Sequence, residues 1–162
     1  MSLQHVTHTF EPVFDEHSRI LILGSFPSVK SRQQNFYYGH PQNRFWKVLA
    51  RLFESEVPIT VEEKKAFLLK NGIAVWDVIH SCQIEGSSDS SIRDVVPCDV
   101  ERVLEKSNIQ KIYVNGGTAK KLYDKYLFSK TKIEGILLPS SSPANARYSL
   151  ERLVEEWRII CQ

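Results

Sequence analysis

One stretch of the chain gathers side chains that could bind a planar base. Residues 24–46 read GSFPSVKSRQQNFYYGHPQNRFW and follow the apolar run 20–23. Three aromatic residues, Phe36, Tyr37 and Tyr38, precede imidazole, amide and guanidinium groups. Aromatic rings exposed beside basic and amide side chains can stack on a base next to a phosphate. The same composition also fits an ordinary loop whose rings cover the core, so both interpretations stay open.

The remainder of the chain alternates between two hydrophobic patterns. Apolar runs predict buried strands at 19–23, 72–79, 111–115 and 133–138. Helical spacing or end signals predict helices from about 43 to 53, at 60–71, 99–106 and 116 to about 128, and around 150–157. Strands that alternate with helices predict parallel pairing and helices on both faces. We therefore expect a three-layer α/β/α fold around a central four-stranded parallel sheet.

This fold would bring distant polar segments together. Ligands of open α/β sheets bind beyond the carboxyl ends of the strands. Residues 24–46 follow the first predicted strand, and residues 139–147, which read PSSSPANAR, follow the fourth. Asn43 begins a predicted helix, where asparagine is a favoured cap and where free N–H groups can meet a phosphate. Asp77 interrupts the apolar end of the second predicted strand and must be partnered or face a cleft.

Two regions lack clear periodicity. We expect residues 1–18 to form an irregular arm over the core, with surface histidines, inside a single domain spanning 1–162. Residues 80–97 form a long polar loop, either a flexible linker or a loop that lines the site. Asp89 and Ser91 are weak candidates for contacts there. Gly116-Gly117 is too short for a phosphate-binding fingerprint, so we interpret it as a tight turn with a possible phosphate contact at Gly117.

Composition narrows the function classes. The chain has 162 residues, a formal charge of +2 and three scattered cysteines. That charge alone does not indicate nucleic acid, although basic residues cluster around 30–51 and 120–125. Three cysteines supply neither a four-cysteine metal site nor a disulfide framework, so we expect no metal, no other cofactor and a reducing cytoplasm. No stretch reaches membrane-spanning length, and the N-terminus lacks a signal-like apolar region.

Two motifs resemble those of a known family. GSFPS at 24–28 and HPQNRFW at 40–46 resemble the first motif region of the uracil-DNA glycosylase superfamily. The mismatch-specific branch carries a catalytic asparagine where this chain has Phe26. The substitution resembles the hypoxanthine-DNA glycosylase branch, in which the important amide comes from the second segment, here Asn43. The turn at 139–147 resembles the second glycosylase motif, with Ser140 in place of histidine or asparagine.

The resemblance implies a monofunctional DNA glycosylase that hydrolyses the N-glycosidic bond of a deaminated base, foremost hypoxanthine, in base excision repair. Asn43 would position the attacking water, and backbone N–H groups around Gly24 and Ser25 would stabilise the departing base. Tyr38 would stack on the base, with Phe36 and Tyr37 as alternates. Asp77 would read the base or bind loop amides. The base-binding candidates are Gly24, Ser25, Phe26, Phe36, Tyr38 and Asp77.

The partner implied is damaged DNA, duplex or single-stranded, bound by a monomer with no membrane contact. The turn at 139–147 would press into the minor groove, where Ala144 and Asn145 would fill the space of the extruded nucleotide. The alternative is a surface turn before the last helix. The DNA-binding candidates are Ser28, His40, Arg44, Gly117, Ser140, Ser142, Pro143, Ala144, Asn145 and Arg147.

Two alternative functions remain open. One is the same fold acting on uracil or thymine mispairs, against which Phe26 in place of asparagine argues. The other is a non-catalytic module that binds DNA lesions or nucleotides. No lysine is placed to act as a Schiff-base nucleophile, so we expect no lyase activity.

Overall fold

A computed structural model describes residues 3–8, 10–34, 36–85 and 89–162. Its centre is a four-stranded sheet of β2 (Ile20–Gly24), β3 (Ile73–Asp77), β6 (Lys111–Asn115) and β7 (Gly135–Leu138). The strands are parallel and lie in the order β3-β2-β6-β7. The predicted four-stranded parallel sheet is therefore confirmed.

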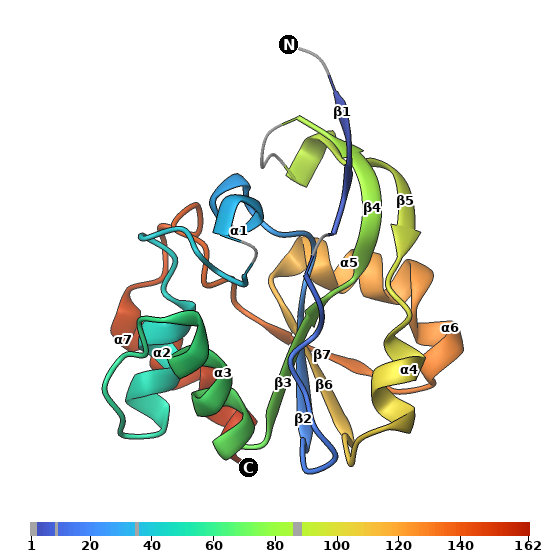
Figure 1. Ribbon diagram of the computed structural model, residues 1–162. Coiled ribbons are helices and arrows are strands. Elements are labelled where there is room, and N and C mark those ends of the chain that lie inside the picture. Colours follow the sequence, from blue (N-terminus) through green and yellow to red (C-terminus); the bar gives the residue numbers. More distant parts are fainter. Residues whose placement is uncertain (1–2, 9, 35, 86–88) are drawn as a thin grey trace.

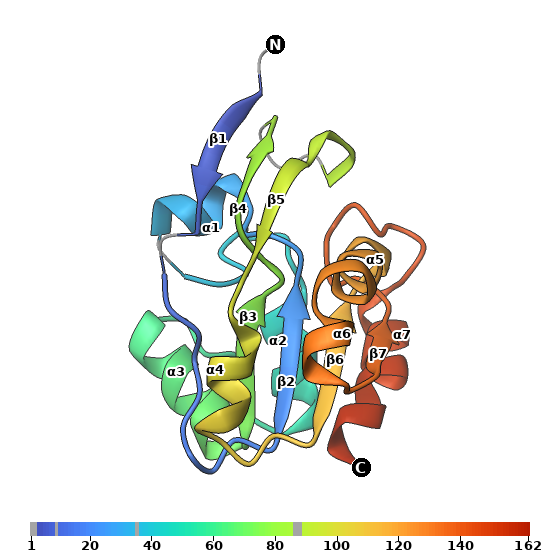
Figure 2. The same ribbon diagram turned by 90° about the vertical axis from the view of Figure 1, so that its right-hand side faces the viewer.

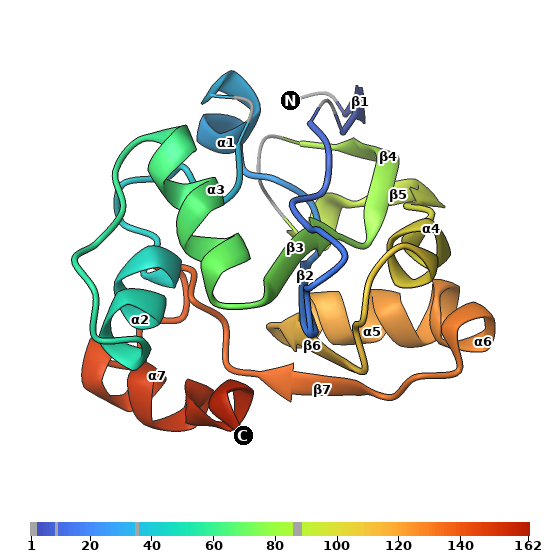
Figure 3. The ribbon, with the colours of Figure 1, turned by 60° about the horizontal axis from the view of Figure 1, so that its bottom comes forward.

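Helices cover both faces of this sheet, which gives the expected three layers (Figures 1 and 3). One face carries α2 (Phe45–Leu52), α3 (Val61–Lys70) and α7 (Leu150–Trp157), which continues into the short helix Arg158–Cys161. The other carries α4 (Val100–Glu105), α5 (Gly117–Tyr126) and α6 (Phe128–Thr131). None of the helices in the described residues is both long and apolar enough to cross a membrane.

The core forms because both faces of the sheet are covered. Every residue of β2 and β3 is buried, as expected for parallel strands between helix layers. The α3 helix begins at a complete capping box between Thr60 and Glu63, and Gly72, with φ of 71°, follows its last residues. These local signals were readable from the sequence, and the structure confirms them.

A second, three-stranded sheet corrects two predictions. β1 (Gln4–Thr7), β4 (Ile79–Ile84) and β5 (Arg93–Pro97) pair antiparallel in the order β1-β4-β5. The sheet extends beyond the carboxyl ends of the central strands (Figure 2). The predicted irregular arm at 1–18 and the predicted loop at 80–97 were therefore wrong in part. Because β1 and β5 are mostly solvent-exposed, neither carries an apolar run long enough to indicate a buried strand.

Residues 80–97, which were predicted to form a loop, contain the weak contact candidates Asp89 and Ser91. A short 3₁₀ turn spans Asp89–Ser91, and the Ser91 hydroxyl accepts a hydrogen bond from the Glu85 backbone N–H. Ser91 therefore helps to shape the turn between β4 and β5. The side chain of Asp89 and residues 86–88 lie outside the described residues.

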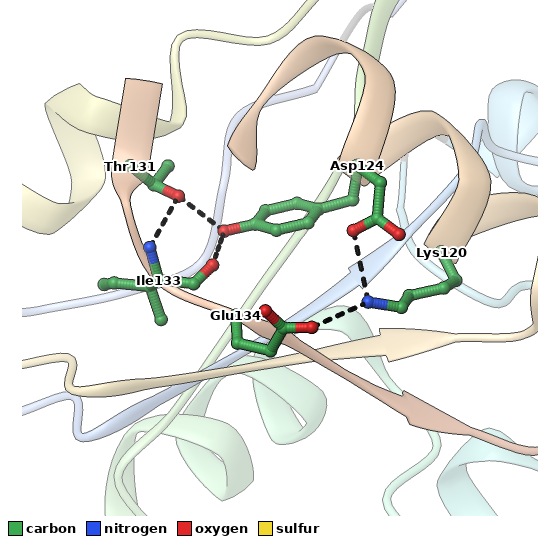
Figure 4. Close-up of polar contacts among 6 residues, drawn as sticks. Lys120, Asp124, Thr131, Ile133 and Glu134 are labelled. Carbon is green, nitrogen blue, oxygen red and sulfur yellow. Dashed lines mark hydrogen bonds and ion pairs between the residues drawn. The ribbon is translucent and has the colours of Figure 1, made fainter. Parts of the chain in front are cut away.

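Side chains on α5 fix that helix to the segment leading into β7 (Figure 4). Lys120 Nζ lies 3.1 Å from Asp124 Oδ1 and 3.4 Å from Glu134 Oε1. The Tyr123 hydroxyl lies 2.6 Å from both the Thr131 hydroxyl and the Ile133 carbonyl oxygen. Lys120 thus belongs to an ion-pair network with two carboxylates of this region.

Candidate functional site

A cavity of about 170 Å³ opens at the carboxyl ends of the central strands. Residues from all four strand ends or the loops after them border it: Gly24, Ser25, Phe26, Pro27, Ser28, Ser31, Tyr37, Tyr38, Asn43, Asp77, Asn115, Ser140, Ser141 and Ser142. Both glycosylase-like segments therefore meet at one site, as the predicted topology requires.

Arg44 joins the two segments directly. Its backbone N–H donates to the Ser141 carbonyl oxygen over 3.1 Å. Its guanidinium donates to the carbonyl oxygens of Ser142 at 2.8 Å, Asn145 at 3.1 Å and Tyr148. A planar guanidinium with several donors suits such multiple anchoring. We therefore interpret Arg44 as the residue that holds the 140–148 turn in place, and its contact with DNA stays a prediction.

Asn43 belongs to a polar network beneath the same turn. Its Oδ1 accepts a hydrogen bond from the Ser141 hydroxyl over 2.8 Å and one from the Phe45 backbone N–H over 3.0 Å. Asn115 in turn exchanges two bonds of 3.0 Å with Ser141, which is fully buried. Side chains from two loops and from the end of β6 thus fix one another.

This network determines which end of the Asn43 amide is free. A backbone N–H can only donate, so the atom that faces Phe45 must be the oxygen. With both bonds made, the two lone pairs of Oδ1 are used, and Nδ2 makes no hydrogen bond to a described residue. Because Asn43 borders the cavity, its amide offers donors there. The N-cap of α2 is Arg44 and not Asn43 as expected, although Asn43 Oδ1 still accepts the N–H of Phe45, the first residue of the helix.

Tyr38 is the aromatic residue best placed for base stacking. Its ring lies 3.9 Å from that of Phe45 at an angle of 17°, and it borders the cavity. Its φ of 52° is unusual for a bulky residue. The hydroxyl is buried without a hydrogen-bond partner in the described chain. Burial, with the negative charge of Asp77, holds the Tyr38 pKa well above its ordinary value, so the group stays a donor.

The other two aromatic candidates, Phe36 and Tyr37, are both buried. Phe36 is only 3 % exposed, stacks on Trp46 and is not among the residues that border the cavity. It is a core residue, which corrects its assignment to base binding. Tyr37 borders the cavity but is equally buried, and its hydroxyl donates to the Glu11 carbonyl oxygen. The three-residue aromatic run therefore divides between core and site.

Asp77 lies in the floor of the cavity, paired with a residue that sequence reasoning missed. Its Oδ2 is 2.8 Å from His8 Nε2, and both side chains are almost wholly buried. The imidazole takes the place of the loop amides considered as partners from sequence. It also corrects the expectation of surface histidines for His8. The sequence signal was weak: an unpaired acid at a strand end requires a partner, without indicating which.

Gly24 permits this arrangement. A Cβ on Gly24 would lie 2.5 Å from Asp77 Oδ1 and 3.0 Å from the Tyr38 hydroxyl. Phe26, two residues later, borders the cavity and also packs against the apolar cluster of Ile79, Cys82 and Ile84. The residue that replaces the motif's asparagine therefore connects the cavity to the second sheet.

The remaining DNA-contact candidates surround the cavity or lie near it. Pro143, Ala144 and Arg147 are exposed, as a loop that meets DNA requires. Asn145 is half-buried, and its Nδ2 donates to the Ser140 carbonyl oxygen. The hydroxyls of Ser140 and Ser142 accept bonds from backbone N–H groups inside the turn. All of these contacts stay predictions.

Three further candidates lie on neighbouring loops. Ser28 accepts a bond from the Ser31 backbone N–H at the start of α1 (Val29–Gln34). His40 Nδ1 accepts one from the Gln42 backbone N–H. Gly117 is the first residue of α5, with open space where a side chain would lie. In the described part of the chain, no three acidic, histidine or cysteine side chains converge to hold a metal ion.

The arrangement has the chemistry of a base-reading pocket. A carboxylate acceptor, an amide donor and a phenol donor border one small cavity beside an aromatic ring. Comparison with known proteins is consistent with such a base-reading pocket. The model of the Uracil DNA glycosylase superfamily matches residues 11–160. The chain belongs to this superfamily.

Relatives with assigned names resemble nearly the whole chain. A protein named hypoxanthine DNA glycosylase from Methanosarcina acetivorans is 38% identical over 153 residues, 93% of this chain and 95% of the relative. One of the same name from Methanosarcina barkeri is 34% identical over 149 residues, 91% and 93% of the two chains. The solution structure of a putative uracil DNA glycosylase from M. acetivorans has a TM-score of 0.78 at 34% identity and covers 94% of this chain and 97% of its own.

Proposed function

We propose that the protein is a monofunctional DNA glycosylase that releases hypoxanthine from deoxyinosine in DNA, within base excision repair. One observation carries the proposal: the loop holding Asn43 and the turn at 140–148 are bonded together over one cavity. Relatives named hypoxanthine DNA glycosylase, at 34% and 38% identity over most of the chain, support the choice of base.

Base recognition would use the complementary groups of the cavity. Hypoxanthine carries an N–H at N1, where adenine has a lone pair. An ionised carboxylate can only accept, so Asp77 Oδ1 would pair with N1–H and disfavour adenine. The Asn43 Nδ2 and Tyr38 hydroxyl donors would bind acceptor atoms of the base such as O6. The target is inaccessible within a duplex, so the nucleotide would first be extruded.

The chemistry would be dissociative. The bond between C1′ and N9 breaks with its electron pair on the base, and water then adds to the oxocarbenium-like sugar and loses a proton. Asn43 was expected to position this water. Its free group is a donor, however, and donation to a water lone pair makes that water a weaker nucleophile. Asn43 would therefore act mainly by donating to the departing base, whose charge grows as the bond breaks.

Other parts of the proposal follow from the same site. No lysine is among the described residues that border the cavity, which supports hydrolysis without lyase activity. Damaged DNA would be the partner of a monomer, and the exposed tip around Pro143, Ala144 and Arg147 would meet the duplex. We propose the cytoplasm as the location, because Cys82, Cys98 and Cys161 are free thiols.

The direct test is release of free base from four matched duplexes. Each carries one inosine, uracil, xanthine or thymine mispair, and the released base is identified by mass spectrometry. We expect hypoxanthine release to be fastest. Faster release of uracil would favour the alternative activity within the superfamily. Tight binding to inosine-containing DNA without any base release would favour a lesion-binding module.

A further inference from the structure

We propose that His8 is a positioning residue that sets base specificity by holding Asp77 in its reading orientation. This inference rests on the proposed function, because it concerns how the same cavity distinguishes bases. It assigns a role in the site to the residue directly after β1 (Gln4–Thr7), outside both glycosylase-like segments.

The two oxygens of Asp77 have different surroundings. Oδ2 lies 2.8 Å from His8 Nε2, in a pair whose side chains are 2 % and 4 % exposed. Oδ1 lies 2.5 Å from the point that a Cβ of Gly24 would occupy, and both Gly24 and Asp77 border the cavity. A carboxylate held through one oxygen cannot rotate without breaking that bond. His8 therefore fixes the direction in which the other oxygen meets a base.

His8 is itself held from several sides. Its backbone N–H donates to the His80 carbonyl oxygen over 2.6 Å, which extends the pairing of β1 with β4. Its ring packs 4.4 Å from Phe10 and 5.9 Å from Tyr37. Aromatic packing excludes water and strengthens a buried hydrogen bond. The imidazole is thus a rigid donor to Asp77, delivered by the second sheet.

The other ring nitrogen indicates the tautomer. Nδ1 is buried and has no hydrogen-bond partner in the described chain. His8 also borders a second cavity of about 350 Å³, together with Trp76, His80 and Arg102. A proton on Nδ1 would be a buried donor without an acceptor and would leave Nε2 with only a lone pair facing the carboxylate. The proton on the ring then belongs on Nε2, where the carboxylate accepts it.

Substitution at position 8 should therefore change specificity and not only rate. Without the imidazole, Asp77 would lose the partner that orients it. The carboxylate could then turn away from N1–H. A site that hydrogen-bonds a particular N–H rejects analogues without it, and loss of the orientation weakens that rejection.

The test compares two substrates under single-turnover conditions. One duplex carries inosine, and the other carries 2′-deoxynebularine, whose purine lacks both O6 and the N1 proton. We expect His8→Leu to lower the inosine-to-nebularine rate ratio by about tenfold, the equivalent of one hydrogen bond. His8→Gln, which keeps an N–H donor of similar reach, should keep the ratio near that of the unaltered protein. His8→Asn, which is shorter, should behave like His8→Leu.

A purely structural role would lower both rates together and leave the ratio unchanged, and that result would overturn the inference. Should the variants fail to fold, ¹⁵N NMR of the unaltered protein decides: an Nε2–H proton on His8 is expected, and an Nδ1–H tautomer would contradict it. If the unaltered protein releases no hypoxanthine, the proposed function fails and this inference with it. Hypoxanthine release with an unaffected ratio removes only the role of His8.

Discussion

At the scale of single residues, the site depends on groups whose partners are already assigned. The side-chain oxygen of Asn43 accepts hydrogen bonds from Phe45 and Ser141, which leaves its N–H donors available at the cavity. One carboxylate oxygen of Asp77 is hydrogen-bonded to His8. Such pre-arranged groups need little reorganisation when a base arrives, which is how fixed dipoles stabilise a transition state.

The Tyr38 hydroxyl is the polar group with the clearest expected phenotype. Because it is buried without a partner in the described residues, Tyr38→Phe should raise the free energy of unfolding by about 1 kcal/mol. The same change should slow hypoxanthine release about tenfold, because the base loses a donor. Urea unfolding and single-turnover kinetics measure the two effects. A variant that is less stable yet fully active would contradict this role.

Gly24 gives a steric prediction. Gly24→Ala would place a methyl group 2.5 Å from Asp77 Oδ1, so we expect a loss of about 1–3 kcal/mol in stability together with slower base release. Gly117→Ala is the matched control for stability, because its Cβ would meet no heavy atom within 4 Å. Thermal unfolding of the two variants compares them. Equal stability in both would show that the close approach at Gly24 is unimportant.

At the scale of elements, the carboxyl ends of β2, β3, β6 and β7 form the site, and the loops after them are tied together by Arg44. Much of this framework was predictable. Apolar runs indicated the four central strands, and the capping box at Thr60 indicated α3. The strands of the second sheet were not predictable. β1 and β5 bury few side chains, and the pairing of β1 with β4 joins residues 4–7 to residues 81–84, which are distant in the sequence.

Arg44 provides the test of how the two loops are joined. Arg44→Ala removes three side-chain bonds to carbonyl oxygens of the 140–148 turn, so we expect about 2 kcal/mol less stability and faster hydrogen exchange at 140–148. Arg44→Lys keeps the positive charge but lacks the planar guanidinium. It should therefore restore little of the stability and little of the exchange protection at 140–148. Full restoration of DNA binding and of exchange protection by lysine would instead indicate a phosphate contact.

At the scale of the whole molecule, sequence predicted which segments meet but not how their atoms pair. The topology brought residues 24–46 and 139–147 to one edge. The bonds that decide the chemistry join Asn43 to Ser141 and His8 to Asp77, across 98 and 69 residues. No local pattern encodes such contacts, because each depends on packing of the complete fold. This is also why Phe36 and Tyr38, only two residues apart, have different roles.

Buried acids of high pKa predict how the whole protein responds to alkali. Burial raises the pKa of Tyr37, Tyr38, Cys98 and Tyr123 above their ordinary values. Above the ordinary values of 9.0 for thiols and 10.0 for phenols, the unfolded chain therefore loses protons that the folded chain retains. The contribution of these groups to the free energy of unfolding should therefore be fully present below pH 9 and should be lost as the pH rises further.

Thermal unfolding between pH 8 and pH 11 measures this fall. Tyr37→Phe removes one of the titrating groups, so its melting temperature should decline less steeply with pH than that of the unaltered protein. Parallel declines for the two proteins would show that Tyr37 does not contribute.

The central claim is that Asn43 acts on a base held between the two joined loops. The most direct measurement compares Asn43→Ala with the unaltered protein for both binding and single-turnover cleavage of one inosine-containing duplex. We expect affinity to change only a few-fold, since the surrounding loop contacts remain, while hypoxanthine release slows by about 100-fold, as for loss of a donor to developing charge. Unchanged release of hypoxanthine by Asn43→Ala would contradict the account.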